Sequence, residues 1–248
     1  SEAYRWRGRT RTHVLTSGLD DYPRAEEPHV GELHVDLHAW MGFFAEVMRT
    51  FAEMLGLEDD VEEYERHARG IAANVIDLHW SDAERMFCDA AVDHTDESVL
   101  VCHRGYVSLF PMLLQLLPAQ SEQLGAVLHL LRDRAHLWSE HGLRSLSKSS
   151  KFYGTDENYW RGAIWIPINY LALRALHNTY MRTPGPHQTL AAETYKELRT
   201  NVINTVLNAY EETGYSWEQY DPEDGHGRRG HPFTGWTSTV VLMMAEEY

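Results

Sequence analysis

The chain has 248 residues and a formal net charge of -15, with 22 lysines and arginines against 37 aspartates and glutamates. This balance excludes a general binder of nucleic-acid backbones, because such binding needs an excess of clustered cations. Hydrophobic residues make up 43% and charged residues 24%, which excludes a disordered chain. No apolar run approaches the roughly 20 residues of a membrane-spanning helix. The two cysteines, Cys88 and Cys102, are either joined or both free, and the sequence leaves this open.

The first part of the chain predicts a pair of long helices. From residue 34 to 55 the apolar residues recur mostly at intervals of three and four, as in an amphipathic helix, and Gly56 is a suitable stop. A second helix is expected to begin at Asp59 or Asp60, either of which can cap it, and to run to about Leu78. Because the linker is short, the two helices are expected to form an antiparallel hairpin.

Further helical segments follow, each rich in apolar residues. They span residues 104–117, 118–138, 163–181, 187–211 and 234–247. Pro111 interrupts or starts the first of them, Ser121 helps to open the second, Pro167 kinks the third and Thr234 caps the last. The run 183–186, with two prolines and a glycine, is a break. About seven or eight helices in pairs predict an all-α fold.

Three long connections between these helices are rich in Trp, Tyr, Gly, Asp and Arg. They are residues 12–31, 145–162 and 214–235. Aromatic rings interleaved with carboxylates and arginines are typical of a sugar-binding surface, where rings stack on pyranose faces and charged groups bind hydroxyls. The alternative is that these loops cover the helix ends and bury their own aromatic residues.

The first connection carries a pair of adjacent carboxyls, Asp20 and Asp21. Two carboxyls that share a desolvated site cannot both ionise easily, so one tends to keep its proton, as a general acid must. Gly18 permits a tight turn before them, and Arg24 follows them. The alternative is an Asp-rich surface turn without chemistry.

The third connection carries Glu218 between Trp217 and Tyr220. Such neighbours can hold a carboxylate in a shaped, partly dry pocket, whereas the following Asp221-Pro222 pair is explained as a turn. Two carboxyls on separate loops suggest glycoside hydrolysis, with one as acid and the other as base or nucleophile.

A third segment lies at the start of the first long helix. Glu32, Asp36 and Trp40 are four residues apart and share one helix face, which suits binding of hydroxyl groups. His34 and His38 have the spacing of metal ligands, but no third ligand is indicated, so no metal is expected. Alternatively, Glu32 simply favours the helix dipole.

Two more segments carry aromatic residues near the remaining loops. In residues 156–165, Trp160 can stack on a sugar and Arg161 can donate to it, or Arg161 can pair internally with Asp156 or Glu157. The other candidate binding residues of these two segments are Tyr159, Trp165, His231, Phe233 and Trp236.

Taken together and in this order, the five segments resemble glycoside hydrolase family 63, in its branch of eukaryotic processing α-glucosidases. The resemblance implies an (α/α)6 barrel and removal, with inversion, of the terminal α-1,2-linked glucose from the triglucosylated N-glycan precursor. The family's Ser-Gly-x-Asp segment places the general acid on Asp20, and its Glu-x-Tyr-Asp segment places the general base on Glu218. Residues 32–40 match the family's substrate-binding segment, with departures at Leu33, His38 and Ala39.

The resemblance also implies the surroundings of this chain. A full barrel has twelve helices, so residues 1–248 are expected to be the C-terminal part of a catalytic domain whose other part, a β-sandwich domain and a membrane anchor lie elsewhere in the protein. The expected partner is a glucosylated N-glycan, no cofactor is needed, and the expected location is the lumen of the endoplasmic reticulum. The implied substrate-binding residues are Asp21, Arg24, Glu32, His34, Asp36, Trp40, Tyr159, Trp160, Arg161, Trp165, Trp217, Tyr220, His231, Phe233 and Trp236.

Three alternatives remain open on the sequence alone. The same barrel type serves trehalases and other α-glucoside hydrolases, and hydrolysis of trehalose would discriminate them. The chain can also be a catalytically silent glycan-binding module, for which Glu218→Gln would change nothing. A helical interaction scaffold is the third alternative, and it predicts a protein partner and no effect of small sugars.

Overall fold

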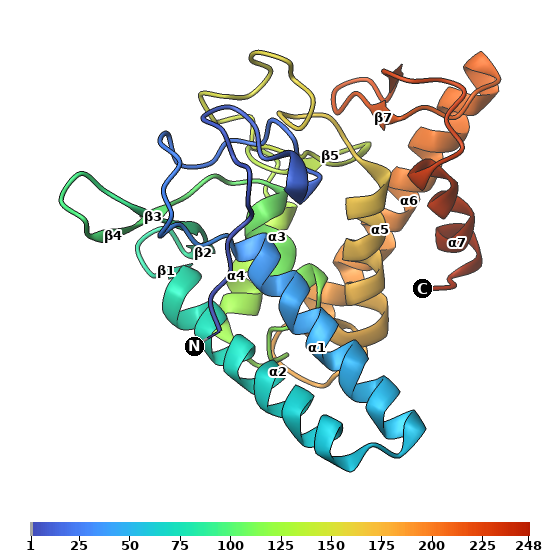
Figure 1. The fold of residues 1–248 in the computed structure, drawn as a ribbon. Helices are drawn as coiled ribbons and strands as arrows, with labels where there is room; N and C mark the ends of the chain where they lie inside the picture. The colour runs from blue at the N-terminus through green and yellow to red at the C-terminus, as the bar shows by residue number, and fades with distance from the viewer. Residues whose placement is uncertain (1) are drawn as a thin grey trace. The chain divides into compact units, whose positions relative to one another are not determined.

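The computed structural model describes residues 2–248 and divides them into two compact units. The first unit comprises residues 2–103 and 107–117, and the second comprises residues 104–106 and 118–248. Both are mostly helical (Figure 1). The prediction of an all-α fold is wrong in one respect, because each unit also contains short antiparallel β-hairpins in the connections between its helices.

The two long helices of the first unit form the predicted antiparallel hairpin. They are α1 (Val35–Leu55) and α2 (Glu58–His79), and they pack side by side (Figure 1). Gly56 ends α1 with a φ of 70°, a conformation that favours glycine. The predicted caps were wrong: Asp59 and Asp60 lie within the first turn of α2, where their charges favour the helix dipole, and Leu57 precedes them as N-cap.

An alanine and a glycine of α1 lie where this helix packs against its neighbours. Ala45 of α1 packs with Ala68 and Ile71 of α2 in one buried cluster. A Cβ added at Gly42 would lie 2.9 Å from the side chain of Leu116, so this glycine permits a close approach. Four larger apolar side chains of α1 are instead exposed, namely Phe44, Phe51, Met54 and Leu55.

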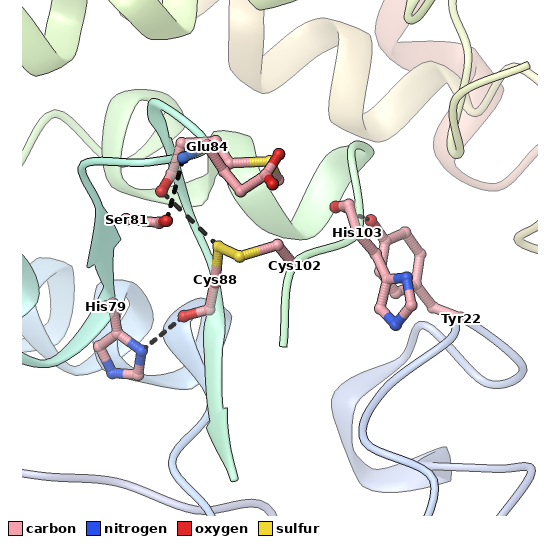
Figure 2. The surroundings of a disulfide bond; sticks show 8 residues. Tyr22, His79, Ser81, Glu84, Cys88, Cys102 and His103 are labelled. Atoms are coloured by element: carbon pink, nitrogen blue, oxygen red, sulfur yellow. Dashed lines mark hydrogen bonds between the residues drawn. A yellow bond between two sulfur atoms is a disulfide. The ribbon is translucent and has the colours of Figure 1, made fainter. Parts of the chain in front are cut away.

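Two β-hairpins separate α2 from α3 (Tyr106–Leu113). Strand β1 (Trp80–Ser81) pairs with β2 (Met86–Phe87), and β3 (Asp89–Val92) pairs with β4 (Ser98–Val101). Cys88 and Cys102 form a disulfide at the base of the second hairpin (Figure 2). Helix α3 is shorter than the predicted 104–117, and it accommodates Pro111 in its interior.

The second unit contains four α-helices among residues 104–106 and 118–248. They are α4 (Glu122–Arg132), α5 (Ile166–Ala175), α6 (Gln188–Thr213) and α7 (Val240–Ala245), with a π-helical turn, η2 (Leu176–Tyr180), after α5 and a 3-10 turn, η3 (Trp236–Thr239), before α7. Ser121 caps α4 as predicted, because its hydroxyl accepts from the Leu124 N–H at 3.2 Å. No helix within residues 2–248 is long and apolar enough to cross a membrane.

Three details of the predicted helices in this unit were wrong. The second predicted segment does not reach 138: α4 ends at Arg132, since Asp133 turns the chain by accepting from the Ala135 N–H at 2.7 Å. Pro167 opens α5 rather than kinking it, because its missing N–H costs nothing in the first turn. Gly235, not Thr234, precedes η3.

Hydrogen bonds join the long connections of the second unit to its hairpins. These hairpins pair β5 (Trp138–Ser139) with β6 (Gly142–Leu143) and β7 (Gln219–Tyr220) with β8 (Gly227–Arg228). Ile164 and Tyr220 exchange backbone hydrogen bonds of 2.9 and 3.0 Å. This pairing places the end of the 145–162 connection against the 214–235 connection, which carries Glu218.

Candidate functional site

Asp20 lies on a compact loop of the first unit. A 3-10 turn, η1 (Leu15–Ser17), precedes it, and Gly18 follows that turn with a φ of 73°. The Val14 N–H donates to the Asp20 carbonyl at 2.9 Å and closes the loop. The side chain of Asp20 is half-buried, whereas Asp21 is buried. Of the two adjacent carboxyls, that of Asp20 therefore keeps the larger access to solvent.

A buried ion network holds the end of this loop. Arg24 Nη1 donates to Asp89 Oδ2 at 2.8 Å and to Asp36 Oδ1 at 3.2 Å, and its Nη2 donates to Asp36 Oδ2 at 2.5 Å. Burial acts to raise the pKa of Asp89, but the Arg24 guanidinium beside it holds that pKa below its usual range. Arg24 and Asp36 were both predicted to bind substrate, and here they form an ion pair with each other inside the unit.

Glu32 is likewise occupied by internal partners. Its Oε2 accepts from Arg9 Nε at 2.7 Å, and its Oε1 accepts from the His29 N–H. His34 Nδ1 accepts from the Trp6 N–H at 3.0 Å, which leaves the proton on Nε2, 3.4 Å from Glu32 Oε2. Burial would raise the pKa of Glu32, but the hydrogen bonds from His34, Arg9 and His29 lower it below its ordinary value.

His38 and Trp40, the other candidate residues near the start of α1, contact residues outside the Arg24 and Glu32 groups. His38 Nε2 donates to the Ile71 carbonyl at 2.8 Å, and burial lowers its pKa, so this ring is neutral. Trp40 is half-buried against Phe110, with 5.8 Å between ring centroids. Among residues 2–248, no group of three or more His, Cys, Asp or Glu side chains could hold a metal ion.

Glu218 lies in the second unit, directly before β7, with both carboxylate oxygens engaged. Oε1 accepts from the Tyr159 hydroxyl, and Oε2 accepts from the Gly230 N–H at 3.1 Å. The main chain is fixed as well, since the Glu218 carbonyl accepts from Trp236 Nε1 at 2.9 Å. The side chain is half-buried. The carboxylate is thus oriented by two donors and still reachable.

Four aromatic rings, which we call the Glu218 aromatic cluster, pack around these partners: Tyr159, Trp160, Trp165 and Trp236. Trp160 and Trp165 stack with 3.7 Å between centroids and 5° between planes. The edge of Tyr159 meets Trp165 at 4.8 Å, and Trp236 tilts against Trp165 at 5.7 Å. Trp236 is 37% exposed, whereas Trp165 is fully buried. Trp236 therefore offers ring surface to a ligand, and Trp165 supports it from within.

A second aromatic group lies on the same connection. Trp217 packs on the exposed ring of His231, with 3.8 Å between centroids, and Phe233 packs on Trp236 at 4.6 Å. A Cβ at Gly227 would lie 2.0 Å from Trp217 Cγ, so glycine is required there for the Trp217 ring to lie over the hairpin. Tyr220 is fully buried, and its hydroxyl accepts from the Trp217 N–H at 3.2 Å, which makes it a support of this group.

Arg161 forms the internal salt bridge that was expected as the alternative to sugar binding. Its Nη1 pairs with Asp156 Oδ2 and donates to Thr155 Oγ1 at 2.9 Å. Its guanidinium also lies over the Phe152 ring, 5.6 Å from the centroid. Arg161 therefore shapes the 145–162 connection from within.

The family model described as "Glycosyl hydrolase family 63 C-terminal domain" matches residues 1–246. The chain therefore belongs to glycosyl hydrolase family 63. The family 63 domain is 51% identical over 247 residues to the probable mannosyl-oligosaccharide glucosidase of Schizosaccharomyces pombe, covering 100% of this chain and 31% of that protein. It is 42% identical to the mannosyl-oligosaccharide glucosidase of Saccharomyces cerevisiae, covering 98% of this chain and 30% of that protein. The chain thus spans about a third of the length of these relatives.

The fold of the family 63 domain is similar to that of a crystallised relative. The family 63 mannosylglycerate hydrolase from Thermus thermophilus, in complex with glucose, aligns with a TM-score of 0.64 and 20% identity. The alignment covers 86% of this chain and 48% of that one. The family 63 domain accordingly shares the helical fold of that hydrolase, which is an α/α barrel.

Several residues that organise the family 63 domain were not predicted from the sequence. Asp89 supplies one carboxylate of the buried network although it is 65 residues from Arg24. Arg229 lies over the Tyr159 ring, 5.4 Å from its centroid, and donates to the Glu157 carbonyl. No local pattern marks these residues. The nearest signal for Asp89 is its position beside Cys88.

Proposed function

We propose that the family 63 domain is the C-terminal part of an (α/α)6 catalytic domain, comprising residues 1–248, in an inverting α-glucosidase. Its reaction would be removal of the terminal α-1,2-linked glucose from the triglucosylated N-glycan precursor. The observation that carries this proposal is Glu218, a half-buried carboxylate with a donor on each oxygen and an aromatic cluster beside it. The two relatives named as mannosyl-oligosaccharide glucosidases support the choice of glycan.

In this mechanism Glu218 is the general base. The Tyr159 hydroxyl and the Gly230 N–H orient its carboxylate, and a water bound against the reachable side loses a proton to it. The oxygen of that water attacks the anomeric carbon from the face opposite the leaving group, so the product is β-glucose. Trp236 supplies the exposed ring on which the glucose stacks.

Asp20 is the general acid of the same proposal. It protonates the glycosidic oxygen as the bond to the anomeric carbon breaks, so the aglycone leaves as an alcohol. The greater access of Asp20, compared with the buried Asp21, supports this assignment. The buried network of Arg24, Asp36 and Asp89 then supports the loop from inside instead of binding sugar directly.

The surroundings of the domain follow from the same proposal. The remaining barrel helices and a β-sandwich domain would belong to the same protein, and the exposed Phe44 and Phe51 of α1 are suited to being covered by them. We place the protein in the lumen of the endoplasmic reticulum. The Cys88–Cys102 disulfide supports that placement, because disulfides persist in oxidising compartments.

The first test follows glucose release from a triglucosylated high-mannose glycan by proton NMR, with the longest native protein that contains this chain. We expect β-glucose to accumulate before mutarotation produces the α-anomer. Initial release of α-glucose would contradict the role of Glu218 as a base. Trehalose is assayed in parallel, and its hydrolysis in place of the glycan would favour the trehalase-type alternative.

A second test concerns the donor to Glu218. Tyr159→Phe keeps the ring against Trp165 and removes the hydroxyl that donates to Glu218 Oε1. Because a hydrogen bond to a charged group contributes about 1.5–3 kcal/mol, we expect kcat to fall by about 10- to 100-fold. The control is Tyr210→Phe, an exposed tyrosine of α6, which should leave kcat unchanged. Equal kcat values for Tyr159→Phe and wild type would show that the hydroxyl does not orient the base.

A further inference from the structure

The first anchor of the Asp20 loop lies next to Cys102. The carbonyl of His103, directly after Cys102, accepts a hydrogen bond from the Tyr22 hydroxyl at 3.1 Å, and Figure 2 shows Tyr22 beside His103. Tyr22 follows Asp20 by two residues and is 2% exposed. Burial raises the pKa of the phenol, so it remains a donor at physiological pH. The position of residues 102–103 therefore helps to set the position of the loop.

The second anchor lies next to Cys88. Asp89 directly follows it, and Asp89 Oδ2 accepts from Arg24 Nη1 at 2.8 Å. Cys88 is itself tied to the end of α2, since its N–H donates to the His79 carbonyl at 2.8 Å and its carbonyl accepts from His79 Nδ1 at 2.9 Å (Figure 2). Burial lowers the pKa of His79 to about 4, so the ring is neutral at pH 7. This side of the disulfide is therefore connected to the last residue of α2.

The disulfide joins these two anchors covalently. The backbone pairing between β3 and β4 ends with the pair Asp89 and Val101. The S–S bond links the next pair of residues, Cys88 and Cys102, and His103 directly follows Cys102. Tyr22 and Arg24 follow Asp20 by two and four residues. Tyr22 is bound to His103, the residue after Cys102, and Arg24 is bound to Asp89, the residue after Cys88. One covalent bond thus sets the spacing of both attachment points.

We propose that the Cys88–Cys102 disulfide positions the loop that carries Asp20. It would do so by fixing the segments that hold the His103 carbonyl, to which Tyr22 donates, and the Asp89 carboxylate, to which Arg24 donates. The inference rests on the proposed role of Asp20 as general acid. Cys88, Cys102 and Tyr22 act here as positioning residues. Two electrons and two protons convert the disulfide into two thiols, so a reducing dithiol has the same effect on the loop as removal of the cysteines.

The consequence for catalysis depends on the leaving group. A general acid accelerates cleavage when the departing oxygen needs a proton, as it does in a glycan, and a misplacement of about 1 Å can cost about 100-fold. Fluoride leaves without protonation. A displaced Asp20 loop should therefore slow hydrolysis of the glycan and leave hydrolysis of α-D-glucosyl fluoride nearly unchanged, whereas a general loss of structure would slow both.

The experiment compares Cys88→Ala/Cys102→Ala with wild type in the longest native protein that contains this chain. We expect kcat/KM for the triglucosylated glycan to fall by about 10- to 100-fold and that for glucosyl fluoride to change by less than about twofold. Tyr22→Phe, which keeps the disulfide, should show the same selectivity with a loss of about 2- to 10-fold. The matched control is Thr95→Ala, which removes the hydrogen bond from the Thr95 hydroxyl to Asp93 Oδ1 in the β3–β4 turn and should leave the hydrolysis of both substrates unaffected.

A readout that is independent of activity accompanies the kinetics. Hydrogen exchange of the amides of residues 19–22 and of Arg24 should rise by about tenfold or more in the double cysteine variant, while exchange in α4 stays at the wild-type rate. Unchanged exchange over residues 19–24, no kinetic loss, or an equal loss on both substrates would each overturn the inference. Asp20→Asn separates the two proposals. If this variant loses activity on the glycan and on glucosyl fluoride equally, the assignment of Asp20 as the acid fails. If Asp20→Asn loses activity on the glycan alone but the double cysteine variant does not, only the disulfide inference fails.

Discussion

Glu218→Gln is expected to lower kcat for glucose release by about 1,000-fold while changing KM by less than about threefold. Glutamine has nearly the shape of glutamate, and its carbonyl oxygen can still accept one of the two hydrogen bonds that hold the side chain. It cannot accept a proton from the attacking water. The loss therefore falls on the chemical step and not on binding of the sugar.

Two comparisons make this expectation specific. Glu223→Gln removes a carboxylate from the same hairpin, where it pairs with Lys148 at 2.6 Å, and it should keep kcat within about threefold of wild type. Glucosyl fluoride should be hydrolysed as slowly as the glycan by Glu218→Gln, because the water must be activated for either substrate. Retained activity on the fluoride would mean that Glu218 donates a proton to the leaving group instead.

The sequence was most informative where local chemistry decides the structure. Gly56 and Ser121 were recognised as a helix stop and a cap because each acts on its own neighbours. The β-hairpins were missed because three of the four pair strands of only two residues, which are too short to show an alternating pattern. The periodicity of residues 34–55 predicted an amphipathic helix but not which of its side chains are buried: Ala45 packs with Ala68 and Ile71, whereas the larger Phe44 and Phe51 are exposed.

In the candidate site, too, residues in compact segments could be predicted, whereas residues with partners distant in sequence could not. Glu218 and its aromatic neighbours occur as compact sequence segments, so the cluster could be anticipated from residue types alone. The buried ion pairing of Arg24 could not be anticipated, because its partner Asp89 lies on a β-hairpin that the sequence pattern did not reveal. The carboxylate of Asp36 fits a sugar site or a buried ion pair equally well until its neighbour is known. Partners distant in sequence thus decided which polar residues face inward.

The buried network makes Arg24 the residue whose loss should destabilise the first unit most. Arg24→Leu removes the cation between Asp36 and Asp89 and leaves both carboxylates nearly inaccessible to water. Removing one partner of a buried ion pair costs about 3–5 kcal/mol, so we expect the free energy of unfolding at pH 7 to fall by that amount. Arg69→Leu, at an exposed pair with Glu65, should change it by less than about 0.5 kcal/mol.

The pH dependence of this loss follows from Asp89. In the wild type its pKa lies below the ordinary value, so its stabilising contribution is present at pH 7 and disappears as pH falls through and below about 4. Without Arg24, burial dominates and raises that pKa, so protonation in the folded state relieves part of the penalty in acid. Denaturant unfolding is measured at pH 7 and pH 5, with hydrogen exchange of α1 and β3 as the local readout. The difference in the free energy of unfolding between variant and wild type should be smaller at pH 5 than at pH 7. A gap that stays constant or widens would mean that water reaches these carboxylates, and that the loop of Asp20 rests on a hydrated surface instead of a dry ionic core.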